Sequence, residues 1–147
     1  MQLTDHFADT ELGVAGQDAQ IVANATHLCL ILLEPIREQF GPLAIDDGYR
    51  NPQHNAAVGG APDSQHLYIG QNAAADIRPM AAGLQVVFDW IRLQSHLQFD
   101  QCILEFSHSL PACIHISYNG GLAQQRREAM TGETNGAGPY ENVEVNP

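Results

Sequence analysis

Two histidines and one aspartate carry the clearest chemistry in this sequence. His66 and Asp76 lie in a polar, glycine-containing stretch, and His115 lies far downstream between Ile114 and Ile116. Neutral imidazole nitrogens and a carboxylate oxygen are typical zinc ligands, and three protein ligands leave a fourth position for water. The sequence therefore predicts a catalytic site in which His66, Asp76 and His115 hold one Zn²⁺ ion.

The surroundings of the two histidines support this choice. His66 follows a loop rich in glycine and proline, while His115 lies in an apolar segment where an unpaired imidazole is costly. A buried histidine that donates to a backbone carbonyl is the alternative for His115. Spacing alone makes a weaker signal than a local paired motif such as HExxH.

Two more residues suit metal-assisted hydrolysis. Glu105 lies in an apolar segment and is the candidate that takes a proton from water and passes it to the leaving group. Arg50 offers a guanidinium fork to a substrate carboxylate. The simpler alternatives are an outward-facing carboxylate at Glu105 and an ion pair of Arg50 with Asp46 or Asp47.

Two amphipathic helices are expected to support these residues. Apolar side chains recur at helical spacing over 17–40, and again from Ala81 or Ala82 to Ser95. Pro35 cannot donate to the helical ladder, so we expect a kink or a restart there. Residues 122–130 are a third, short helical candidate.

Strand-like segments alternate with these helices. Residues 101–106 and 113–118 are apolar and predict an antiparallel hairpin, and 43–50 is a further short strand. A polar loop is expected over 51–62, and residues 67–77 read as a second hairpin with its turn around 70–73. The sequence thus predicts an α+β fold with a small antiparallel sheet flanked by helices.

Composition narrows the class of protein. The 147 residues suit one domain, assigned to 1–130, with a loosely ordered tail over 131–147. The net charge of −11 repels phosphate backbones and argues against nucleic acid as a partner. No uninterrupted apolar run approaches the ~20 residues of a membrane span, and no secretory signal is expected at the N-terminus. The three cysteines are too few for a disulfide framework.

Five short segments together carry a family resemblance: 48–55, 58–61, 64–66, 74–77 and 115–117. They resemble the zinc D-Ala-D-Ala carboxypeptidases of peptidase family M15, most closely its short phage and bacterial branch, over about residues 7–118. The family motif is SxHxxGxAxD, followed later by a histidine in a Trp-x-His strand. The resemblance implies a hedgehog/DD-peptidase fold, zinc ligation by His66, Asp76 and His115, and substrate binding by Arg50 and Ser64.

The chain departs from this motif between its first two ligands. Ten positions separate His66 from Asp76, where the family has seven. Three extra residues in a paired hairpin would turn Asp76 to the opposite face unless a turn or bulge absorbs them. In that case Asp63 and His54 are the substitute ligands.

The second departure is Cys113, where the family has tryptophan. Because it lies two residues before His115, Cys113 should share its strand face and lie near the metal. It would serve there as a packing residue, an additional ligand or an oxidisable thiol.

The resemblance implies zinc-dependent hydrolysis of peptide bonds in the peptidoglycan stem at the bacterial cell wall. The enzyme would be a DD-carboxypeptidase, or an endopeptidase such as a phage lysin. Two other classes are alternatives: a zinc-stabilised, catalytically inactive binding module of hedgehog-like fold, and a zinc-free structural protein of a phage particle. The bond cleaved and the oligomeric state do not follow from the sequence.

Overall fold

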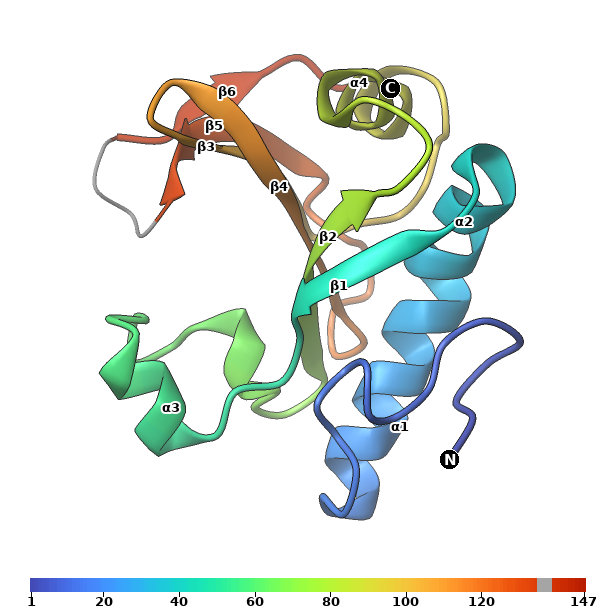
Figure 1. Cartoon of the computed structure of the whole chain (residues 1–147), viewed down its shortest axis with the longest axis vertical. Helices are drawn as coiled ribbons and strands as arrows, with labels where there is room; N and C mark the ends of the chain where they lie inside the picture. The colour runs from blue at the N-terminus through green and yellow to red at the C-terminus, as the bar shows by residue number, and fades with distance from the viewer. Residues whose placement is uncertain (135–138) are drawn as a thin grey trace.

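The computed structural model describes residues 1–134 and 139–147, and these form a six-stranded sheet with helices packed on it (Figure 1). The strand order is β1-β2-β4-β3-β5-β6, and all neighbouring strands are antiparallel except β3 and β5. The strands are β1 (Leu43–Asp47), β2 (Asn72–Pro79), β3 (Gln101–Ser107), β4 (Leu110–Asn119), β5 (Glu128–Glu133) and β6 (Glu141–Val143). The helices are α1 (Ala19–Leu28), α2 (Glu34–Phe40), α3 (Pro52–Ala57) and α4 (Leu84–Leu93). The predicted α+β class is confirmed.

The two faces of the central strands differ in chemistry. Side chains alternate between faces along a strand. One face packs against α1 and α4 and carries the apolar core residues Ala75, Ile77, Cys102, Leu104, Ile114 and Ile116. The other face therefore presents the intervening residues of the same strands, among them Asp76, Glu105 and His115.

The N-terminal helix changes its winding before Pro35. Asp18 caps α1 by accepting a hydrogen bond from the backbone N–H of Ile21, at 3.0 Å. A π-helical turn, Cys29–Leu33, then joins α1 to α2, whose first turn contains Pro35. A wider turn accommodates the missing N–H of proline without ending the helix. The predicted restart at Pro35 takes this form.

The same helix, Ala19–Phe40, is long and apolar enough by length and composition to cross a membrane. Core helices of globular proteins pass the same test, and here Ala25, Leu28, Leu32, Leu33 and Ile36 are fully buried. The Asn24 side chain also donates to the carbonyl of Gly70 at 2.9 Å. In this structure the segment is a core helix.

The predicted hairpin over 101–118 is confirmed as β3 and β4. Its two-residue turn consists of His108 and Ser109, with φ of 51° and 67°. Positive φ at both positions is the property of the type I′ turn, whose twist suits a hairpin.

Residues 67–77 do not form the predicted hairpin. Gln65–Leu67 is a 3₁₀ turn, after which Tyr68 and Gly70 adopt positive φ of 52° and 64° and lead into β2. Of the extra residues expected around Ile69, Asn72 and Ala73, only Ile69 lies in this turn, because Asn72 and Ala73 already pair with Asn119 and Tyr118 of β4. The face of the sheet to which Asp76 points is set by its position in β2 alone. Asp76 therefore does not turn to the opposite face, as the extra residues could have caused.

The expected loop over 51–62 contains a short helix, α3. Asn51 accepts a hydrogen bond from the backbone N–H of His54 at 2.7 Å, and Pro52 occupies the first helical position. Both are favourable helix-start signals. The periodicity criterion missed α3 because six residues are too few to show a helical repeat.

The helix expected over residues 122–130 was also wrong. No helix forms over 122–130, and β5 pairs in parallel with the outer edge of β3 while β6 pairs with β5. Strand β5 contains little apolar alternation, and the unpaired backbone groups of β3 supply its pairing surface instead. Residues 135–138 of the predicted tail lie outside the described residues.

Candidate metal centre

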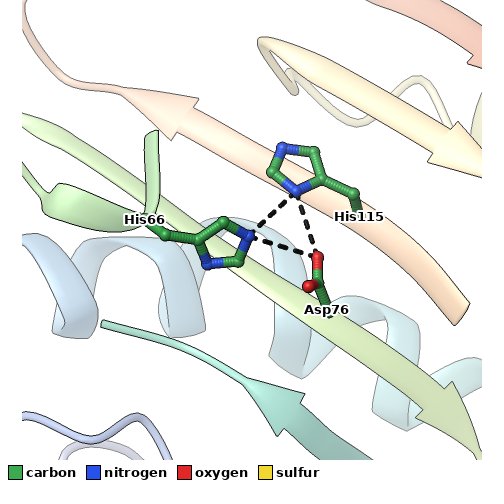
Figure 2. Close-up of side chains that lie close together, drawn as sticks. All are labelled: His66, Asp76 and His115. Atoms are coloured by element: carbon green, nitrogen blue, oxygen red, sulfur yellow. Dashed lines mark hydrogen bonds and ion pairs between the residues drawn. The ribbon is translucent and has the colours of Figure 1, made fainter. Parts of the chain in front are cut away.

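Three donor atoms converge on the face of the sheet opposite α1 (Figure 2). The Nδ1 atom of His115 lies 3.2 Å from Nε2 of His66 and 3.1 Å from Oδ1 of Asp76. Nε2 of His66 lies 3.3 Å from the same carboxylate oxygen. Four ligands about 2.0–2.1 Å from a tetrahedral zinc ion lie about 3.3–3.4 Å from one another. The two imidazoles and the carboxylate fit three corners of such a site.

Strand register brings Asp76 and His115 together. Asp76 on β2 pairs directly with His115 on β4, which in turn pairs with Ile103 on β3. Directly opposed residues of an antiparallel pair have neighbouring side chains on one face. Backbone pairing between β2 and β4, which are not consecutive in sequence, therefore sets this half of the site.

His66 reaches the site from the 3₁₀ turn. Its Nδ1 atom lies 2.7 Å from the carbonyl oxygen of Gly48, and its own carbonyl accepts from the backbone N–H of Arg50 at 2.7 Å. A ring nitrogen facing a carbonyl must donate, so the second nitrogen, Nε2, carries the lone pair of the neutral ring. The Gly48 carbonyl thus turns the ligating nitrogen of His66 toward Asp76.

The electrostatics of the cluster favour a positive charge. Burial opposes ionisation of Asp76, but hydrogen bonds and charge from His115 and His66 outweigh it and hold the pKa of Asp76 well below its ordinary value. Burial also opposes protonation of His66, yet Asp76 raises the pKa of His66 overall. The cluster therefore attracts a proton or, in its place, a metal cation.

A cleft of about 760 Å³ opens over this cluster, and all six predicted site residues line it: Arg50, Ser64, His66, Asp76, Glu105 and His115. Glu105 and Cys113 each present a ligand atom within 4.8 Å of the Asp76 carboxylate. The expectation that Cys113 lies beside the cluster is confirmed. Burial, followed by the charge of Asp76, raises the pKa of Glu105.

Arg50 and Ser64 also have structural roles. The Arg50 Nε donates to Asp47 at 2.5 Å, so the ion pair weighed as an alternative is present. Its Nη2 lies 3.8 Å from Oδ2 of Asp76 at the cleft wall. The Ser64 hydroxyl accepts from the backbone N–H of His66 at 3.3 Å and caps the 3₁₀ turn.

The substitute ligands lie apart from the cluster. Asp63 lines the cleft but belongs to neither of the two ligand groups found among the described residues, and His54 is exposed on α3. Sequence reasoning missed Gln65, whose Oε1 lies 3.3 Å from Nε2 of His115. The signal in the sequence that could have pointed to Gln65 was its position between Ser64 and His66.

The chain matches a known protein family. The family model described as Peptidase M15 matches residues 5–116, a range that contains all six residues predicted for the site. A search of curated proteins found no match. Because the family model spans well over half of the chain, the chain belongs to the peptidase M15 family.

Proposed function

We propose that this protein is a zinc-dependent peptidase that hydrolyses peptide bonds in the peptidoglycan stem at the bacterial cell wall. The observation that carries the proposal is the convergence of His66, Asp76 and His115 beneath a cleft that also contains Glu105. Membership of the M15 family supports a peptide as substrate and a metal as cofactor.

The donor set determines which cation fits. Two imidazole nitrogens and one carboxylate oxygen are the ligand types of many catalytic zinc sites. When bound there, zinc supplies Lewis acidity and lowers the pKa of a coordinated water toward ~7. The chain contributes one negative charge, from Asp76, and holds both rings in place from outside the cluster through Gly48 and Gln65.

Glu105 is the proposed proton carrier. It accepts a proton as water attacks the scissile carbonyl and donates a proton to the departing amine. The raised pKa of Glu105 brings the carboxyl closer to neutral pH, which suits a group that must both accept and release a proton.

Arg50 and Ser64 are the proposed substrate-binding residues. The stem peptide ends in a carboxylate, which a guanidinium binds through charge-assisted hydrogen bonds. Only Arg50 and Arg126 contribute basic side chains to the cleft lining among the described residues, while the whole chain has a net charge of −11. A carboxylate substrate would therefore be directed to these arginines.

Protein purified without added metal tests this proposal. We expect about one zinc per chain and hydrolysis of a synthetic stem pentapeptide or of purified peptidoglycan. Release of terminal D-alanine would identify a carboxypeptidase, and release of internal peptides an endopeptidase. Zinc binding without hydrolysis of any wall peptide would contradict the proposal and favour the inactive binding module.

Glu105→Gln separates catalysis from metal binding. Removal of a general base lowers the rate by about 10²–10⁴-fold while the zinc content stays unchanged. Glu38→Gln changes an exposed carboxylate on α2 and serves as the matched control. Full hydrolysis by Glu105→Gln would exclude Glu105 as the proton carrier.

A further inference from the structure

A chain of hydrogen bonds runs outward from the far side of the His115 ring. His115 Nε2 lies 3.3 Å from Oε1 of Gln65, and Gln65 Nε2 donates to Oδ2 of Asp100 at 2.7 Å. Arg126 closes the chain by donating to both oxygens of Asp100, at 2.6 and 2.8 Å. None of Gln65, Asp100 and Arg126 belongs to the ligand set or to the proton carrier described above.

Asp100 is the fixed point of this chain. It is 1% exposed, and a buried carboxylate without a partner would be strongly disfavoured. The two-armed contact with Arg126 supplies that partner and is the stronger, charge-assisted form of hydrogen bond. Asp100 is therefore held as an ionised carboxylate, which can accept hydrogen bonds but cannot donate them.

The ionised state of Asp100 decides the orientation of the Gln65 amide. A carboxylate accepts only from the NH₂ group, so Gln65 must turn its nitrogen toward Asp100 and its oxygen toward His115. An amide oxygen can only accept, so the His115 nitrogen that faces it, Nε2, must donate. Nδ1 is then the ring atom left to face His66 and Asp76, where a bound cation would take its lone pair.

We infer that Gln65, Asp100 and Arg126 are positioning residues that fix the ring orientation of His115, with Nδ1 toward the metal position. The inference deepens the proposed function and rests on it for the consequence in metal binding. Residues that orient a ligating histidine from outside are typically worth 10–100-fold in metal affinity. His66 needs no such chain because the Gly48 backbone carbonyl orients it directly.

The orientation of the ring can be measured without any metal. In crystal structures of the metal-free protein, we expect one orientation of the His115 ring in the wild type, with Nδ1 toward Asp76, and a rotated or divided ring position in Gln65→Leu. An unchanged ring position in Gln65→Leu, or a wild-type ring with Nδ1 turned away from Asp76, would overturn the inference.

Zinc affinity tests the whole chain of contacts. Gln65→Leu and Asp100→Asn should each raise the zinc dissociation constant about 10–100-fold, and the double variant should lose little more than either single variant. Fully additive losses would show independent effects and contradict the inference. If Asp100→Asn fails to fold, Arg126→Gln makes the same test, since the Arg126 side chain is 49% exposed.

A matched control comes from a second two-armed ion pair. Arg78 also donates to both oxygens of a carboxylate, Asp46, at 2.9 and 3.0 Å, but that pair is exposed and does not line the cleft. Asp46→Asn should leave zinc affinity unchanged. If the wild-type protein binds no zinc, the proposed function fails, while the metal-free crystal structures still decide the inference about His115.

Discussion

The two halves of the candidate site are built differently. Asp76, His115 and Glu105 come from β2, β4 and β3, whose register places them on one face of the sheet. His66 comes from the 3₁₀ turn in the segment between β1 and β2, where single hydrogen bonds to Gly48 and Arg50 hold it.

Because of this difference, the donor atoms of the site and the placement of those atoms can be altered separately. On the strand half, many ladder hydrogen bonds fix the backbone, so a side-chain change there alters the donor atom without moving its neighbours. On the loop half, a backbone change can displace His66 while every donor atom remains.

The largest effect is expected from a change of donor on the strand half. A binding free energy of about 10–16 kcal/mol for zinc, shared among four ligands, corresponds to roughly 10²–10³-fold in affinity per ligand. Asp76→Ala should weaken zinc binding by that factor, measured by competition with a chelator. Asp63→Ala, which removes another carboxylate of the cleft wall, should not. Equal zinc affinity in Asp76→Ala and the wild type would exclude Asp76 as a ligand.

A smaller effect is expected from a backbone change on the loop half. A Cβ atom at Gly48 would collide with the Leu12 carbonyl, so Gly48→Ala must displace the backbone that orients His66. We expect about 1–3 kcal/mol of lost stability and a zinc affinity reduced about 10-fold. Gly83→Ala, where the nearest atom to the new Cβ is 4.0 Å away, is the control. Unaltered zinc binding in a folded Gly48→Ala protein would show that the loop does not position His66.

Protons and zinc compete for the donor atoms of His66 and Asp76, where the two halves of the site meet. The raised pKa of His66 stabilises the metal-free protein below about pH 6.5, and this contribution is lost as the pH rises through the folded-state value. The lowered pKa of Asp76 gives a contribution that is present above about pH 3.9 and lost only in stronger acid. The metal-free protein should therefore be more stable at pH 5.5 than at pH 8, whereas stabilisation by zinc should grow over that interval.

Thermal unfolding at the two pH values, with and without zinc, measures this dependence. A difference of ~2–4 °C per kcal/mol is expected for a chain of this size. Asp76→Asn should abolish the part of the pH effect that depends on His66. If the metal-free Asp76→Asn protein shows the same pH dependence of stability as the wild type, Asp76 is not the cause of the raised pKa of His66.

The smallest effect is expected at Cys113. Its Sγ lies 3.5 Å from Oε2 of Glu105 and takes no part in the triad of His66, Asp76 and His115. Cys113→Ser keeps a donor toward Glu105, so zinc affinity should change less than about 2-fold and hydrolysis only a few-fold. A loss of zinc comparable to that in Asp76→Ala would instead make Cys113 a ligand.

Local patterns in the sequence predicted the elements that local forces determine. The helix over 19–40 and the hairpin of β3 and β4 follow from helical periodicity and from two apolar strands close in sequence. The parallel pairing of β5 with β3 did not, because it joins distant segments by backbone bonds that leave little trace in side-chain pattern.

The candidate site shows the same limit. Residue types singled out His66, Asp76, His115 and Glu105, and the structure brings all four into one cleft. The geometry that unites them was not predictable locally, because Asp76 pairs with His115 across strands that are not consecutive. The supporting residues Asp100 and Arg126 were equally hidden, since their link to His115 runs through Gln65 and exists only in the folded chain.

Anomalous diffraction at the zinc absorption edge, from crystals of protein purified without added metal, would locate the metal ion and its ligands. We expect one strong peak within bonding distance of His66 Nε2, His115 Nδ1 and a carboxylate oxygen of Asp76. A peak held by Asp63 or His54, or the absence of any peak at this cluster, would contradict this expectation.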